Sequence, residues 1–210
     1  YEISTRDWSS DVCSSDLFGA SGELTATTVT NNGSIVMTSG GTFTIANGGT
    51  LANNATFTRG SGTVRFAGTA TVSGTVAFNN VNLDGHVNFG TASTVFGNFT
   101  ISSTGSINTN APFYADNSTL IYSAGATTYN RFNEWQSGTT SELRGVPFNV
   151  QVNASTTLNM DANGSTTRTC RGSLTINGIF TMGSMSEDIL VGQDININTG
   201  GALTLGGISG

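Results

Sequence analysis

The sequence of 210 residues contains no lysine, only 2 prolines, 2 cysteines and 1 histidine, and just 10% of its residues are charged. A typical soluble domain carries about 25% charged residues, so an ordinary cytosolic enzyme domain is not expected. Helix bundles and coiled coils are excluded, because they depend on abundant Ala, Glu, Lys, Leu and Arg at helical spacing. A net charge of −6 without lysine offers little to neutralise phosphates, so no nucleic-acid partner is expected. No apolar run approaches the roughly 20 residues of a membrane-spanning helix, so direct membrane insertion is not expected either.

The segment from Asp7 to Leu17 differs from the rest of the chain, because it has no Gly, Thr or Asn and no alternating pattern. Over its whole length it resembles the translation of a sequencing-library adapter oligonucleotide. Such a scar does not belong to a fold. We therefore predict that residues 1–17 are non-native and disordered, that residues 18–210 form the folded unit, and that no Cys13–Cys170 disulfide exists. A genuine acidic, Ser-rich linker is the alternative.

A short repeat runs through the remaining residues, in which Gly, Thr, Ser and Asn are the commonest types. Its unit is Gly, any residue, apolar, usually polar, apolar. Clear copies begin at Gly33, Gly41, Gly62, Gly74, Gly85, Gly97, Gly172, Gly178 and Gly201. Apolar residues two positions apart lie on the same face of a strand, and the intervening residue lies on the other. The repeat therefore predicts short strands, each preceded by a glycine that permits a backbone bend.

Short strands at regular spacing fit a sandwich, a barrel or a solenoid, and internal repetition favours the solenoid. Two buried apolar side chains contribute roughly 3–6 kcal/mol per strand. Ordering the backbone costs about 1–2 kcal/mol per residue, so one unit is not stable alone and its neighbours must stack on it. We predict an all-β fold, a single-stranded parallel β-helix (β-solenoid) with roughly 20–30 residues per coil. Thr, Ser and Asn at equivalent positions would stack as ladders.

The segment from about residue 112 to 148 interrupts this pattern. It lies between the two prolines and holds every Tyr and Trp outside the N-terminal segment. We predict an irregular, aromatic-rich loop there, and aromatic and arginine clusters are typical of binding surfaces. The alternative is that the Tyr and Trp side chains fill or cover a wide coil. The candidate binding residues are Tyr129, Arg131, Glu134, Trp135 and Arg144.

Two stretches resemble a known class of protein in their composition and in their repetition. These stretches are Thr56–Phe66 with Ala77–Leu83, and Leu120–Tyr122 followed by Tyr129–Pro147. They resemble repetitive bacterial surface and secreted proteins, namely adhesin-like β-solenoids similar to type IX secretion cargo. The resemblance covers roughly residues 18–210. It implies an extracellular or cell-surface location in a bacterium, and a signal peptide and a sorting domain that this sequence does not display.

Residue patterns for catalysis, metals or cofactors are weak. Only His86 and Cys170 remain as soft ligands outside the N-terminal segment, so no metal site, no cofactor and no catalytic residue is predicted. We expect His86 to be exposed and Cys170 to be a small inward-facing residue. Parallel β-helices also include polysaccharide lyases and glycosidases, and the latter need two facing carboxylates. For a glycosidase, the best candidates for these carboxylates are Glu134 and Glu142, together with Asp116.

These observations predict a non-catalytic structural or adhesive segment, a stiff rod that displays loops for contact with surfaces or glycans. The partners that we expect are glycans or cell-surface components, and flanking domains of the same, longer chain. The sequence begins without Met and ends in a Gly-rich stretch, which is why a fragment is expected. The alternative is a fragment of a carbohydrate-active β-helix enzyme, and a third possibility is a segment of a phage or cell-envelope fibre.

Overall fold

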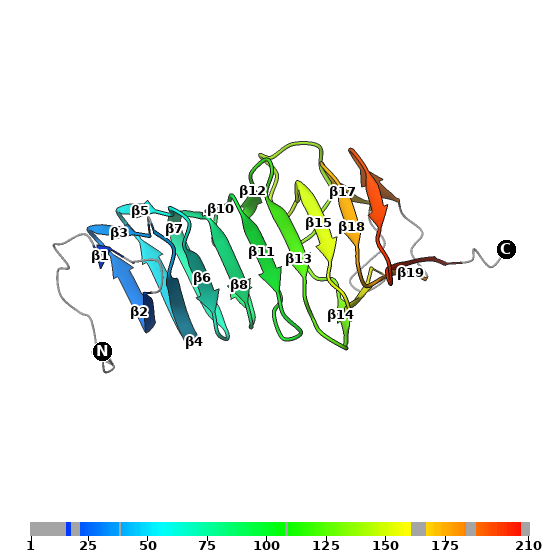
Figure 1. Cartoon of the computed structure of the whole chain (residues 1–210). Coiled ribbons are helices and arrows are strands. Elements are labelled where there is room, and N and C mark those ends of the chain that lie inside the picture. The colour runs from blue at the N-terminus through cyan, green and yellow to red at the C-terminus, as the bar shows by residue number, and fades with distance from the viewer. Residues whose placement is uncertain are drawn as a thin grey trace.

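The computed structural model describes residues 16–17, 22–37, 39–107, 109–160, 167–183 and 188–206. Within them the chain winds repeatedly in one direction, and every pair of strands is parallel. Strands of successive turns stack in register, and the body has about eight turns. The fold is therefore a parallel β-solenoid, as the repeat predicts, and Figure 1 shows its rungs side by side along an elongated body.

Each turn passes over three faces in the same order. The first face contains β2 (Glu23–Asn31), β4 (Thr42–Asn53), β6 (Thr63–Phe66), β8 (Asn80–Leu83), β11 (Asn98–Ile101), β13 (Thr119–Tyr122), β15 (Asn149–Val152), β18 (Leu174–Ile176) and β21 (Ile195–Ile197). The second face contains the later halves of β2 and β4, the first half of β7 (Ala70–Phe78), β9 (Val87–Asn88), β14 (Thr128–Asn130), β16 (Thr157–Asn159), β19 (Ile179–Met182) and β22 (Ala202–Leu205). The third face contains β1 (Asp16–Leu17), β3 (Ser34–Val36), β5 (Thr56–Thr58), the later half of β7, β10 (Ala92–Val95), β12 (Phe113–Tyr114), β17 (Arg168–Cys170) and β20 (Ile189–Val191).

Glycine allows one strand to serve two faces. Gly74 lies in the middle of β7 with φ +77°, a conformation that L side chains rarely adopt. A Cβ atom there would lie 1.9 Å from the Asn53 carbonyl oxygen of the preceding turn. Only glycine therefore fits this bend, at which the strand passes from the second face to the third.

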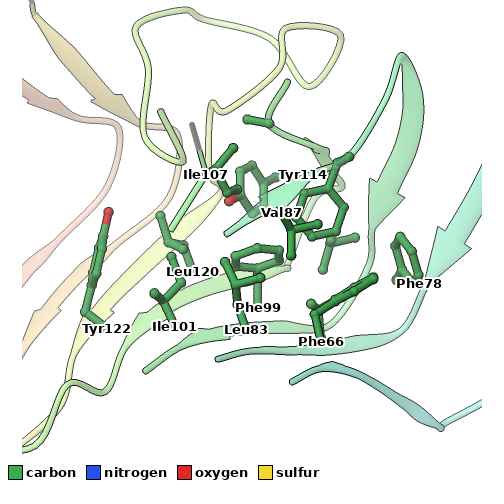
Figure 2. Packing of buried hydrophobic residues seen from close by; sticks show 14 of the residues in the cluster. Phe66, Phe78, Leu83, Val87, Phe99, Ile101, Ile107, Tyr114, Leu120 and Tyr122 are labelled. Atoms are coloured by element: carbon green, nitrogen blue, oxygen red, sulfur yellow. The ribbon is translucent and has the colours of Figure 1, made fainter. Parts of the chain in front are cut away.

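The core is a continuous column of the alternate, inward-pointing side chains. Leu83, Phe99, Ile101 and Leu120 are fully buried, whereas the residues that alternate with them, Asn82, Thr100 and Ile121, point away from the core. Phe66, Phe78, Phe89, Phe99 and Tyr114 meet edge to face in successive pairs, with ring centroids 5.4–6.1 Å apart. Figure 2 shows several of these rings gathered between the strands. Such contacts add to the free energy of burial.

The N-terminal segment is described only at Asp16–Leu17, which form β1 and pair with β3. Residues 1–15, including Cys13, lie outside the described residues, so the predicted boundary at residue 17 stays a prediction. Cys170 is fully buried, as expected for a small inward-facing residue, and burial raises the pKa of its thiol to about 12. The described part of the chain has no helix long and apolar enough to cross a membrane.

Candidate functional site

One turn is longer than the others, and it contains the candidate binding residues. On the first face Val64 pairs in register with Val81, and Val150 pairs with Leu174. Between these pairs Leu120 of β13 is in register with Val150 of β15, the widest separation in sequence between any two partners on this face. After β14 the extra residues form the segment 131–148, drawn in Figure 1 as a loop beyond the strand ends between β12 and β17. We call residues 119–152 the wide coil.

All five predicted binding residues belong to the wide coil, and the side chains of four of them are buried in its interior. The exposed fraction is 4% for Tyr129, 1% for Arg131, and 0% for Glu134 and Trp135. Only Arg144 is partly exposed. The geometry thus corresponds to the alternative in which aromatic side chains fill a wide coil, and direct ligand contact by the four buried residues stays a prediction without support from this geometry.

Glu134 is the centre of a buried polar cluster. Its carboxylate accepts hydrogen bonds from the backbone N–H of Phe132, at 2.9 and 3.1 Å, and from the Tyr122 hydroxyl at 3.1 Å. The Tyr114 hydroxyl donates to the Glu134 backbone carbonyl at 3.2 Å, and Arg131 donates to the Phe132 carbonyl at 2.9 Å. A buried charge is tolerated only with such partners, so the cluster is a structural requirement of the wide coil.

The protonation of the cluster follows from its burial. Burial raises the pKa of Glu134 to about 7, against the opposing effects of its hydrogen bonds and of the Arg131 charge. Burial also raises the pKa of Tyr114, Tyr122 and Tyr129, with the negative charge of Glu134 as the next cause in each. It lowers the pKa of Arg131 and lowers that of Arg168 to about 10. Near neutral pH, Glu134 is therefore the group of this cluster that changes charge.

Trp135 connects the wide coil to the turns that follow. Its indole Nε1–H donates to the Thr169 carbonyl of β17 at 2.8 Å. Its ring packs edge to face on Phe180 at 6.1 Å and lies 6.5 Å from the ring of Tyr122. The side chain therefore bridges successive turns and fills the space that the longer coil creates.

Two arginine side chains, Arg144 of the wide coil and Arg171 of a later turn, tie the wide coil to neighbouring parts of the chain. Arg144 donates to the Gly90 carbonyl at 2.7 Å, to the Asn110 side-chain oxygen at 3.1 Å and to the Thr91 carbonyl. Its guanidinium also lies 5.3 Å from the centre of the Phe113 ring. The side chain thus reaches back to earlier turns of the chain and fixes the returning end of the loop.

Arg171 makes a second clamp of the same kind. It donates to the Tyr114 carbonyl at 2.7 Å, pairs with Asp116 and stacks on Phe148 at 5.3 Å. Sequence reasoning missed this residue, together with Tyr114, Tyr122 and Arg168. For the two tyrosines a signal was present, since each occupies an inward position of the alternation.

The loop of the wide coil ends in a tip, residues 137–143. Ser137, Thr139, Thr140, Glu142 and Leu143 are exposed there, and Leu143 has an exposed fraction of 46%. The tip is anchored behind by hydrogen bonds from Gly138 N–H to the Thr169 hydroxyl and from Gly145 N–H to the Pro112 carbonyl. The recognition chemistry available is therefore serine and threonine hydroxyls, a carboxylate and an aliphatic side chain.

The carboxylates considered for glycoside hydrolysis have different surroundings. Glu134 is buried, whereas Asp116 is exposed and paired with Arg171, and Glu142 is exposed at the tip. His86 is exposed, as expected, and contacts the Ser106 hydroxyl. No group of three or more potential metal ligands occurs among the residues that the structure describes.

By its winding and strand pairing the chain is a parallel β-solenoid. Comparisons with models of protein families, with curated proteins and with solved structures gave no match for this chain. Its function is therefore inferred from the geometry of the wide coil and of the rod that carries it.

Proposed function

We propose that this chain is a non-catalytic segment of an extracellular surface protein of a bacterium, an adhesin-like rod that holds a loop in a fixed position for contact with glycans or other surface components. The observation that carries the proposal is the wide coil, a single extended turn whose loop is braced from within and from outside. A loop that served only to connect strands would not need a buried ionisable cluster and two arginine clamps.

The solenoid supplies the rod and its solubility. Its core is continuous along the described turns, so bending it would require loss of packing between neighbouring turns. Its outward positions are mostly Thr, Asn and Ser, which keep the surface polar at low charge density. A rod that unfolds slowly suits an extracellular location, where no chaperone refolds an unfolded chain.

The placement of the carboxylates supports a non-catalytic role over the glycosidase alternative. Glycoside hydrolysis needs two carboxyl groups that face one bond of a bound substrate. Glu134 hydrogen-bonds within the interior, whereas Asp116 and Glu142 face solvent. Glu134 therefore has no solvent access from which to share a substrate with either of them.

The adhesive role is tested by binding of the purified chain to an array of glycans and to bacterial or host cell surfaces. We expect binding that is lost in a tip variant, Thr139→Ala with Thr140→Ala and Glu142→Ala, while the fold is retained. The control is Thr71→Ala with Ser73→Ala, which changes exposed polar residues of β7. Equal binding by the tip variant and the control, or no binding by the wild type, would overturn the adhesive role.

A further inference from the structure

The arginine side chains that are not buried gather in one region of the rod. Of the six arginines that the structure describes, Arg131 and Arg168 are buried, and Arg65 pairs with Asp84 on the first face. The guanidinium groups of the other three each lie over a phenylalanine ring on or beside the third face, in the pairs Arg59–Phe96, Arg144–Phe113 and Arg171–Phe148. We call these three pairs the arginine–phenylalanine cluster.

Strand register brings two of the phenylalanine rings together. Phe113 of β12 is in register with Thr94 of β10, and Phe96 follows two positions after Thr94. All three side chains point outward from the third face, because the intervening Val95 is buried. Rungs are about 4.8 Å apart and residues about 3.3 Å apart along a strand, so the backbones at Phe96 and Phe113 are separated by about 8 Å. Figure 1 shows β10 and β12 side by side.

The side chain of Arg59 reaches forward along the rod to Phe96. Arg59 follows β5, and Phe96 follows β10, which lies two turns further on. The Arg59 guanidinium lies 3.9 Å from the centre of the Phe96 ring, and it donates to the Asn79 side-chain oxygen of the intervening turn at 3.2 Å. It forms no ion pair with a carboxylate of the described residues, so its positive charge is not compensated locally.

The side chain of Arg171 reaches backward to the same place. It donates to the Tyr114 carbonyl at 2.7 Å and pairs with Asp116. Asp116 follows directly after β12, and β12 pairs with β10, so Asp116 lies one turn after Phe96. The guanidinium groups of Arg59 and Arg171 therefore end on adjacent turns.

The cluster carries an excess of positive charge, whereas the net charge of the chain is −6. Among the described residues only one carboxylate, that of Asp116, forms an ion pair with any of the three arginines. Arg144 donates to two carbonyl oxygens and an amide oxygen, which bind its N–H groups without neutralising its charge. Three guanidinium groups and one carboxylate leave two positive charges beside aromatic rings, of which Phe96 has an exposed fraction of 37%.

We propose that the arginine–phenylalanine cluster binds an acidic polysaccharide, a linear chain of sugars that carry carboxylate groups. Guanidinium groups bind carboxylates through charge-assisted hydrogen bonds, and the exposed part of an aromatic ring packs against the apolar face of a sugar. The cluster offers both on successive turns, as a polymer requires. The site uses Arg59 and Phe96 and no residue of the tip, so it does not depend on the proposed contact at residues 137–143.

The polar side chains around the cluster favour a sugar over a nucleic acid. Asn79 is partly exposed and Asn117 is exposed beside Asp116, so amide groups are available for sugar hydroxyls. A nucleic acid requires many cationic contacts along its phosphates. This chain has no lysine and is acidic as a whole, so it repels such a polyanion outside the cluster.

The experiment is isothermal titration calorimetry of the purified chain with polygalacturonate, alginate and hyaluronate at several salt concentrations. We expect binding that weakens as the salt concentration rises, because salt screens the attraction between exposed charges. The methyl ester of each polymer is the matched control ligand, since it keeps the sugar backbone and lacks the charge. The proposal is overturned if none of the three polymers binds, if the neutral esters bind equally well, or if single-stranded DNA binds as tightly as the polysaccharides.

Substitution of Arg59 tests the position of the site. Arg59→Gln keeps a donor for the Asn79 oxygen and removes the charge, so we expect the affinity to fall about tenfold. Arg65→Gln is the matched control, because it removes the same charge from a residue that is paired with Asp84 on the first face. The control should bind within about twofold of the wild type. Equal losses in the two variants would show attraction to net charge alone and would contradict the site.

Substitution of Asp116 is expected to have the opposite effect. Asp116→Asn removes a carboxylate that repels the ligand, and we expect the affinity to rise about two- to fivefold. Glu23→Gln removes the same charge from an exposed residue of β2 and should change the affinity less. An affinity that is unchanged or lower in Asp116→Asn would count against the cluster. Circular dichroism of each variant checks that the fold is retained.

The tip variant separates this site from the proposed function. Polysaccharide binding that is lost in Arg59→Gln and kept in the tip variant would support the cluster, whatever the tip contributes to adhesion. Binding that is lost in the tip variant and kept in Arg59→Gln would overturn the cluster and leave the proposed function intact.

Discussion

At the scale of single residues, the buried carboxyl group of Glu134 makes the stability of the protein dependent on pH. Its pKa of about 7 in the folded chain exceeds the ordinary value of 4.5. Between these two values Glu134 binds more protons in the folded state than in the unfolded state, so its contribution to stability is greatest below about pH 4.5 and is lost as the pH rises to about 7. A shift of this size corresponds to about 3 kcal/mol.

We therefore expect Glu134→Gln to remove this component of the pH dependence. Gln keeps an oxygen that accepts from Phe132 N–H and the Tyr122 hydroxyl but cannot ionise. Urea unfolding at pH 5 and at pH 8 measures the difference between the two proteins. The variant should gain relative to the wild type at pH 8, and an equal difference at both pH values would contradict the assignment.

Asparagine ladders at the corners supply a second prediction at this scale. Asn53 is buried, accepts from Asn31 at 2.6 Å and donates to the carbonyls of Ala55 and Thr75 at 3.0 and 2.6 Å. Asn53→Ala removes these three hydrogen bonds together, so we expect a loss of about 2–3 kcal/mol in the free energy of unfolding. Asn54→Ala removes a similar bond to Asn32 on the exposed side and should cost below about 0.5 kcal/mol.

The sequence identifies most residues of the core but not the buried polar cluster. Alternation alone places Phe99 and Ile101 inward and Thr100 outward, as observed. It could not place Glu134, because a charged residue in an irregular segment is ordinarily exposed. The burial of Glu134 depends on the Tyr122 hydroxyl and on Arg131, whose convergence is a property of the wide coil and not of any local pattern.

At the scale of elements, the Arg144 clamp determines how firmly the tip is held. We expect Arg144→Ala to increase opening of residues 137–143, because three polar contacts to Gly90, Thr91 and Asn110 are lost together. A local loss of about 1–2 kcal/mol would raise the rate of cleavage after Glu142 by a Glu-specific protease about tenfold.

The control for this measurement is Arg65→Ala. Arg65 forms a 2.7 Å salt bridge with Asp84 but its side chain is 48% exposed, so the pair contributes little to stability. Cleavage after Glu142 should be unchanged in this variant. Equal acceleration in both variants would indicate a general loss of stability and not the release of a clamp.

The strands themselves follow closely from the repeat. Gly62, Gly97 and Gly172 each lie just before the start of a first-face strand, as the Gly-x-apolar-x-apolar unit predicts. The short strands β12 and β14 lie where the repeat is interrupted, and no pattern of glycine marks them. Their pairing comes from the neighbouring turns that they stack on, and this information is absent from a single segment.

At the scale of the whole molecule, stability depends on the column of aromatic rings that runs from Phe57 to Tyr114. Phe89 is fully buried and contacts Phe66, Phe78 and Phe99 with centroids 5.4–6.0 Å apart. We expect Phe89→Ala to lower the free energy of unfolding by about 3–5 kcal/mol. Because each turn is stabilised mainly by its neighbours, hydrogen exchange should accelerate on both sides of the affected turn.

Phe96→Ala is the matched control for this substitution. Phe96 is 37% exposed and lies under the Arg59 guanidinium, so it contributes less buried apolar surface. We expect a loss of about 1 kcal/mol, without acceleration of exchange in the turns around Phe89. A comparable loss of unfolding free energy in both variants would show that the aromatic column does not contribute more to stability than a partly exposed ring.

The unequal lengths of the turns have a consequence for engineering. The wide coil and much shorter turns coexist in one rod without a change of register, since the extra residues leave the winding at a corner and return to it. A foreign peptide inserted between Thr139 and Thr140 would therefore be displayed at a fixed position along the axis of the solenoid. Insertion of peptides at corners of other turns would place them at distances from each other that are set by the number of turns between the insertion sites.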